Sequence, residues 1–134
     1  MPTLKEPKSL IDSAYLSKGT IGNVGMPAEP IAHFSLVVCS TSGIIAGIIE
    51  IIQAIDRPPI LVHVTGNVRS TGFGDDTQTV NLSGEYVISV PPPAIGNYLQ
   101  HFTAHMDINK EWIGTGGFTY SNQKIENVPV KSEN

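Results

Sequence analysis

The sequence predicts an all-β fold, an antiparallel barrel or two-sheet sandwich of about seven strands with an irregular N-terminal arm. Apolar residues come in short runs that are interrupted by turn residues, not in long stretches with helical spacing. Glycine (13 residues) and proline (10 residues) are plentiful, and only 15% of the residues are charged. Helical bundles need more charged residues on their outer faces. At 134 residues the chain is expected to form one domain around one core.

The chain divides into three expected parts. Residues 1–32 contain four prolines and little periodicity, so they are expected to be an irregular arm. Two alternatives remain for this arm, a partly ordered tail and a segment that packs on its own barrel or on a neighbouring subunit. Residues 33–130 form the β domain, and residues 131–134 form a short tail.

Within the β domain, each expected strand ends at a turn signal. The runs "HFSLVVCS" from His33 and "ILVHVTGNVRS" from Ile60 are apolar and are followed by glycine-containing turns. The segment "TQTVNLSGEYVISV" alternates apolar and polar residues, and so does "LQHFTAHMDIN". A period of two with polar residues on one side is typical of a half-buried antiparallel strand. Two further strands, "EWIGTGGFTYS" and "KIENVPV", complete the predicted sheet.

The stretch "SGIIAGIIEIIQAIDRPP" at residues 42–59 carries seven isoleucines, and its conformation decides the architecture. It is too short to span a membrane, which needs roughly twenty apolar residues. As a helix over 44–55 it would place its isoleucines on one face, giving an α+β fold. The β-branched side chains and Gly47 favour a strand. A strand with isoleucines on both sides would leave one face exposed, so we expect a homo-oligomer that covers it.

Three segments resemble a known family. They are "GIIEIIQAIDRPP", "HVTGNV" and "EWIGTGGFTYSNQKIENVPVK", and their layout is similar to a small bacterial family, domain of unknown function 1842. The likeness covers roughly residues 34–130. It implies a compact β domain and supports the strand interpretation of the isoleucine stretch. The family supplies no catalytic residue to carry over.

Composition argues against nucleic acid as a partner and suggests a compartment. The net charge of −4 and the pI of about 5.4 offer no basic field for nucleic acid. The N-terminus has no continuous apolar segment of the signal-peptide kind, and Cys39 is the one cysteine, so we expect a cytoplasmic protein of bacterial type. Cys39 lies among valines and is expected to be a small buried apolar residue.

The histidines do not form a convincing metal motif. His101 and His105 have the i, i+4 spacing of a zinc-binding helix, but in a strand they would lie about 13 Å apart. A metal site would need His105 with Asp107 or Thr103 and with His63 from another strand. We therefore expect no metal and no cofactor, and we interpret His63, His101, Thr103 and His105 as a polar rim.

The leading functional hypothesis is a non-enzymatic oligomeric module for interaction or ligand binding. Trp112 and Tyr120, together with His63, His101 and His105, are the candidate contacts for a small apolar or sugar ligand. One alternative is a small-barrel isomerase or cyclase that acts on an apolar substrate, with a lumen-facing Glu50, His63 or His105 as general acid or base. A second alternative is a structural subunit of a larger assembly.

Overall fold

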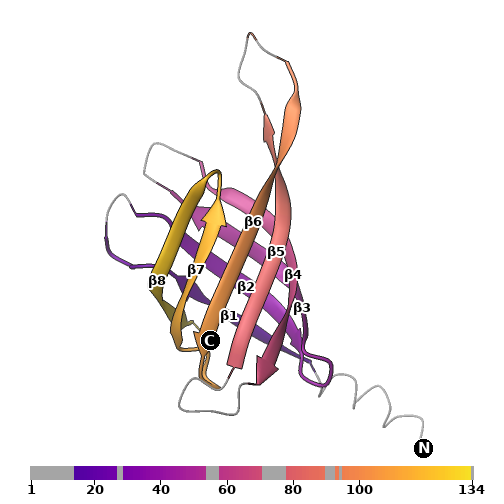
Figure 1. The fold of residues 1–134 in the computed structure, drawn as a ribbon, viewed down its shortest axis with the longest axis vertical. Coiled ribbons are helices and arrows are strands. Elements are labelled where there is room, and N and C mark those ends of the chain that lie inside the picture. Colours follow the sequence, from indigo (N-terminus) through magenta and orange to yellow (C-terminus); the bar gives the residue numbers. More distant parts are fainter. Residues whose placement is uncertain are drawn as a thin grey trace, which may run out of the picture.

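The computed structural model describes residues 14–26, 29–53, 58–70, 78–89, 93 and 95–133, and within them the chain forms eight strands. Each strand pairs antiparallel with the next, and β1 also pairs with β8, so the sheet closes into a barrel (Figure 1). The predicted all-β barrel is confirmed, with one strand more than expected. The strands are β1 (Ala14–Ile21), β2 (Ile31–Cys39), β3 (Ile44–Ile52), β4 (Ile60–Ser70), β5 (Gln78–Ser89), β6 (Asn97–Ile108), β7 (Gly114–Tyr120) and β8 (Gln123–Ser132).

The isoleucine stretch is strand β3, so the strand prediction is confirmed and the helix alternative is wrong. β3 pairs with β2 on one side and with β4 on the other. Ile45, Ile49 and Ile51 point into the barrel and are fully buried, whereas Ile44 and Ile48 point outward and are exposed. β-Branched side chains pack well on a pleated surface, which is why this run favours a strand over a helix. The last residues of the predicted element, 54 and 55, lie outside the described residues.

The lumen of the barrel is a packed hydrophobic core. Phe34, Phe102, Phe118 and Met106 are at most 1% exposed, which leaves no room for water beside them. Phe102 and Phe118 stack with their ring centroids 6.3 Å apart, and Tyr120 continues the stack. An eight-stranded barrel is just wide enough for inward side chains to fill it. The alternation noted in the segments that form β5 and β6 is confirmed, because Val80, Leu82, Phe102 and Met106 face this core.

The N-terminal region departs from the expectation, because strand β1 lies within residues 1–32. The strand signal in the sequence was weak because two inward positions of β1 are Ser17 and Gly19, which interrupt the alternation of apolar and polar residues. Gly19 is required there, since a Cβ would meet the carbonyl oxygen of Lys131 and the ring of Phe34. The expected tail is also shorter, because β8 runs to Ser132. Residues 1–13 lie outside the described part of the chain.

The seam that closes the barrel is short. β1 and β8 are paired at three positions, Gly19 with Ser132, Thr20 with Lys131 and Ile21 with Val130. A backbone hydrogen bond from Glu133 N to Lys18 O, 2.8 Å long, extends the seam at one end. By comparison, β5 and β6 are paired at twelve positions.

The far end of the β5–β6 hairpin projects beyond the rest of the barrel (Figure 1). Pairing of β5 with β4 stops at Glu85, and pairing of β6 with β7 stops at Thr103. The strands continue as a two-stranded ribbon over residues 86–89 and 97–100. From here on we call this ribbon the arm; it is distinct from the N-terminal segment of residues 1–32. The arm has no neighbouring strand on either edge among the described residues, so β4 and β5 separate at this end of the barrel.

Candidate functional site

Part of the outer face of β1–β3 is apolar, and we call it the apolar wall; it comprises Leu16, Val37, Ile44, Ala46 and Ile48. Leu16, Val37 and Ala46 lie opposite one another on the three strands, and Ile44 and Ile48 lie on either side of Ala46 along β3. Leu16, Val37 and Ile44 are 53%, 52% and 61% exposed. The wall offers on the order of 500 Å² of apolar surface, which matches the largest patch of a typical monomer and is often a binding surface. The predicted exposed isoleucine face therefore exists.

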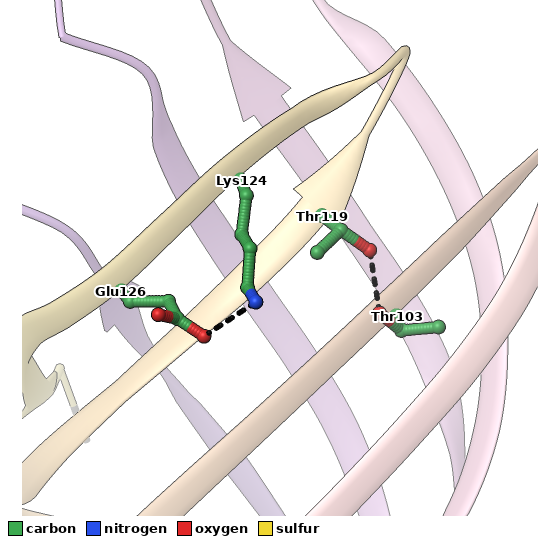
Figure 2. Close-up of polar contacts among 4 residues, drawn as sticks. All are labelled: Thr103, Thr119, Lys124 and Glu126. Carbon is green, nitrogen blue, oxygen red and sulfur yellow. Dashed lines mark hydrogen bonds and ion pairs between the residues drawn. The ribbon is translucent and has the colours of Figure 1, made fainter.

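The same row around the barrel becomes polar from β4 onward. Ala46 is opposite Thr65, and the row continues with hydroxyl side chains across β5, β6 and β7, at Ser83, Thr103 and Thr119. The hydroxyl groups of Thr103 and Thr119 share a hydrogen bond, and on β8 the Lys124 ammonium lies 3.2 Å from a carboxylate oxygen of Glu126 (Figure 2). Along this row the exterior is thus apolar on β1–β3 and polar from β4 onward, and we call the part from β4 onward the polar half.

Two of the predicted histidines lie together on the polar half. His63 on β4 and His101 on β6 lie on either side of Glu85 on β5, because all three are in register. His101 Nδ1 is 3.9 Å from Glu85 Oε1. The side chains of His101 and Glu85 are 82% and 50% exposed, so this ion pair contributes little to stability. With Thr65 and Ser83 these residues line a shallow depression of about 470 Å³, which can offer hydrogen bonds to a polar group.

His105 and Glu50 lie apart from this depression. His105 is in register with Asn81 and Gly117, and Glu50 on β3 is opposite Leu61. The proposed lumen-facing acid or base is wrong for Glu50, His63 and His105, because all three point outward in strands whose alternate residues fill the lumen. Among the described residues, no group of three or more histidine, cysteine, aspartate or glutamate side chains could hold a metal ion.

Trp112 closes one end of the barrel. It lies in the turn between β6 and β7, where the side-chain oxygen of Asn109 accepts hydrogen bonds from the N–H groups of Glu111 and Ile113. The indole is 3% exposed and packs on Phe34 at a centroid distance of 5.8 Å. Its Nε1–H donates to the hydroxyl of Tyr15 over 3.2 Å. Trp112 therefore acts first as a plug for the core.

Tyr120, the other aromatic candidate, is 3% exposed and stacks on Phe118 with centroids 5.9 Å apart. The structure thus places Trp112 and Tyr120 in the core and the three histidines outside the barrel. It does not bring these five side chains to one site. Contact of any of them with a ligand stays a prediction.

A cleft at the opposite end of the barrel was not predicted from the sequence. It opens where β4 and β5 separate, has a volume of about 440 Å³, and contains a hydrogen bond of 2.7 Å between the hydroxyl groups of Tyr86 and Ser121. None of its lining residues is charged: Gln53, Pro58, Pro59, Ile60, Leu61, Tyr86, Val87, Ile88 and Ser121. The separation of two strands leaves no mark on sequence periodicity, so alternation could not have revealed the cleft.

Cys39 is not the buried apolar residue that we expected. It is half-buried at the end of β2, where the chain turns toward β3. Hydrogen bonds from Ser42 and Thr41 stabilise the thiolate and lower the pKa of Cys39 from 9.0 to about 6. The Thr41 hydroxyl lies 3.4 Å from the sulfur. The serine and threonine of the turn, which the sequence shows, were the signal for this effect.

Within the described residues, the protein is a small antiparallel β-barrel with a filled lumen. A family model matches residues 13–125, and the chain belongs to that family, which is described as a domain of unknown function (DUF1842). The resemblance seen in the sequence is thereby confirmed. No curated protein matches the chain. The described residues contain no helix long and apolar enough to cross a membrane.

Proposed function

We propose that this protein is a non-enzymatic interaction module that assembles with further copies of itself through the apolar wall. The observation that carries the proposal is the wall itself, in which Leu16, Val37 and Ile44 are each more than half exposed on neighbouring strands. A standard interface buries about 800 Å² per partner. The wall would supply on the order of 500 Å² of this area, and the polar residues at its edge would supply the rest.

The filled lumen supports a role for the outer surface. Eight-stranded barrels can hold one small ligand in the lumen, which requires inward positions with space between them. Here Phe102 and Met106 are fully buried in a continuous core. Recognition by this barrel therefore uses its exterior.

The polar half is proposed as the rim of the contact and as a surface for a small sugar-like ligand. His63 lies opposite Ile48, so the depression beside Glu85 and His101 borders the wall directly. Interfaces commonly have an apolar centre and a polar, hydrated edge. The free thiol of Cys39 supports the bacterial cytoplasm as the compartment, because reducing conditions keep thiols unpaired there.

Light scattering coupled to size-exclusion chromatography tests the proposal. The Val37→Lys variant places a charge in the centre of the wall and should lower the measured mass of the assembly. The Asn81→Lys variant is a matched control, because it adds the same charge at an exposed position on β5, outside the wall and outside the depression. A parent protein that remains at the 14.3 kDa of one chain at high concentration contradicts the proposal. Equal masses for Val37→Lys and the parent contradict it as well.

A further inference from the structure

Among the described residues, the cleft between β4 and β5 lies beside two strand edges that have no partner strand. The register of β4 with β5 begins at His63 and Glu85, although β4 starts at Ile60 and β5 continues to Ser89. Residues 60–62 and 86–89 therefore face each other across the cleft without pairing. Unpaired backbone N–H and C=O groups along a strand edge are a template for pairing with another strand.

The arm exposes apolar side chains that a monomer leaves in water. Val87 and Leu99 are directly opposite each other and are 60% and 59% exposed, and Tyr98 next to them is 49% exposed. Leu61, on the β4 side of the cleft, is 56% exposed. Neither the arm nor the cleft contains a charged residue, in a chain with a net charge of −4. Two copies can therefore approach here without bringing like charges together.

We propose that the cleft accepts the arm of a second copy of this chain, with the free edge of β5 pairing antiparallel with the same edge of the second copy about a two-fold axis. Four arm residues on β5 span about 13 Å, and three cleft residues on β4 span about 10 Å, so the arm and the cleft match in length. An isologous contact of this kind uses each edge once and closes on itself.

The area available agrees with a stable contact. The exposed parts of the arm and the cleft amount to roughly 600 Å² per copy, so reciprocal exchange buries roughly 1,200 Å², the lower end of the range for specific interfaces. The contact involves strands β4–β6 at one end of the barrel (Figure 1), whereas the apolar wall lies on β1–β3. The two interfaces are separate, so this inference does not depend on the proposed function.

The test measures the mass of the full chain by light scattering for three aspartate variants. Val87→Asp in the arm and Leu61→Asp in the cleft are both at exposed positions, so each should fold and each should lower the mass. Asn81→Asp is the matched control, since it adds the same charge to β5 on the polar half of the barrel and should leave the mass unchanged. Val87→Asp combined with Val37→Lys should yield a particle of 14.3 kDa.

Cross-linking provides a second measurement. In a Cys39→Ser background, Val87→Cys should cross-link two copies with a short bismaleimide, and Asn81→Cys should not. The inference is overturned if Val87→Asp leaves the mass unchanged. It is also overturned if Val87→Asp lowers the mass and Leu61→Asp does not. If Val37→Lys lowers the mass and neither Val87→Asp nor Leu61→Asp does so, the wall interface is retained and the arm contact is overturned. A parent chain that stays at 14.3 kDa and carries a small molecule that is lost in Leu61→Asp, both seen in native mass spectrometry, assigns the cleft to a ligand and also overturns the inference.

Discussion

Trp112 closes one end of the barrel, and the variant Trp112→Ala tests whether this plug is part of the core. The side chain is 3% exposed and packs on Phe34 and, edge to face, on Tyr15. Replacement of a buried tryptophan or phenylalanine by alanine costs about 3–5 kcal/mol. Loss of the hydrogen bond to Tyr15 is one part of this cost, about 1 kcal/mol. We expect the free energy of unfolding to fall by about 4 kcal/mol, against a total of about 5–15 kcal/mol for a domain.

The assay is unfolding in urea followed by far-ultraviolet circular dichroism, because Trp112 is the one tryptophan and its emission disappears in the variant. Trp112→Phe retains a ring on Phe34 and removes the N–H donor, so it should cost about 1–2 kcal/mol. Ile113→Ala is the control at the next position, which is 46% exposed, and should cost less than about 1 kcal/mol. A loss below about 1 kcal/mol for Trp112→Ala would refute the reasoning.

Three further outcomes are expected. Gly66→Ala should cost about 1–3 kcal/mol in the same urea assay, because the methyl group would meet the backbone of β5. Tyr86→Phe removes the hydroxyl that hydrogen-bonds across the cleft and should cost about 1 kcal/mol, and an unchanged midpoint would contradict this role. Alkylation of Cys39 by iodoacetamide should show a midpoint near pH 6, and Ser42→Ala should move it upward. Because folding lowers the thiol pKa from 9.0 to about 6, the stabilisation from Ser42 and Thr41 is complete above about pH 9 and is lost as the pH falls through 6. Thermal unfolding of the parent and of Cys39→Ser across this range checks the sign.

The sequence predicted the strands whose inward residues are large and apolar. In β6, Phe102 and Met106 alternate with polar residues, and this alternation gave the correct buried face. It missed β1, where Ser17 and Gly19 occupy inward positions because the lumen has little space beside Phe34. Alternation of apolar and polar residues indicates which side chains are buried, and an inward glycine has no side chain that could indicate it.

The candidate site was predicted less well, for a related reason. The three histidines lie on the outer faces of their strands, but the position of Glu85 between His63 and His101 depends on the register of three strands, which a single sequence does not encode. Trp112 was a candidate ligand contact because aromatic side chains occur both in ligand sites and in hydrophobic cores. Its burial follows from the turn at Asn109, whose side chain fixes the backbone that directs the indole inward.

The short β1–β8 seam has a consequence for biosynthesis. β1 leaves the ribosome before the other strands, yet its second neighbour is not complete until residue 132 has been made. Until residue 132 has been made, the nascent chain therefore lacks the second neighbour of its first strand. The β1–β8 pairing that closes the barrel can form only after that point, and a chain truncated before β8 should leave this edge of β1 unpaired and open to association with another chain.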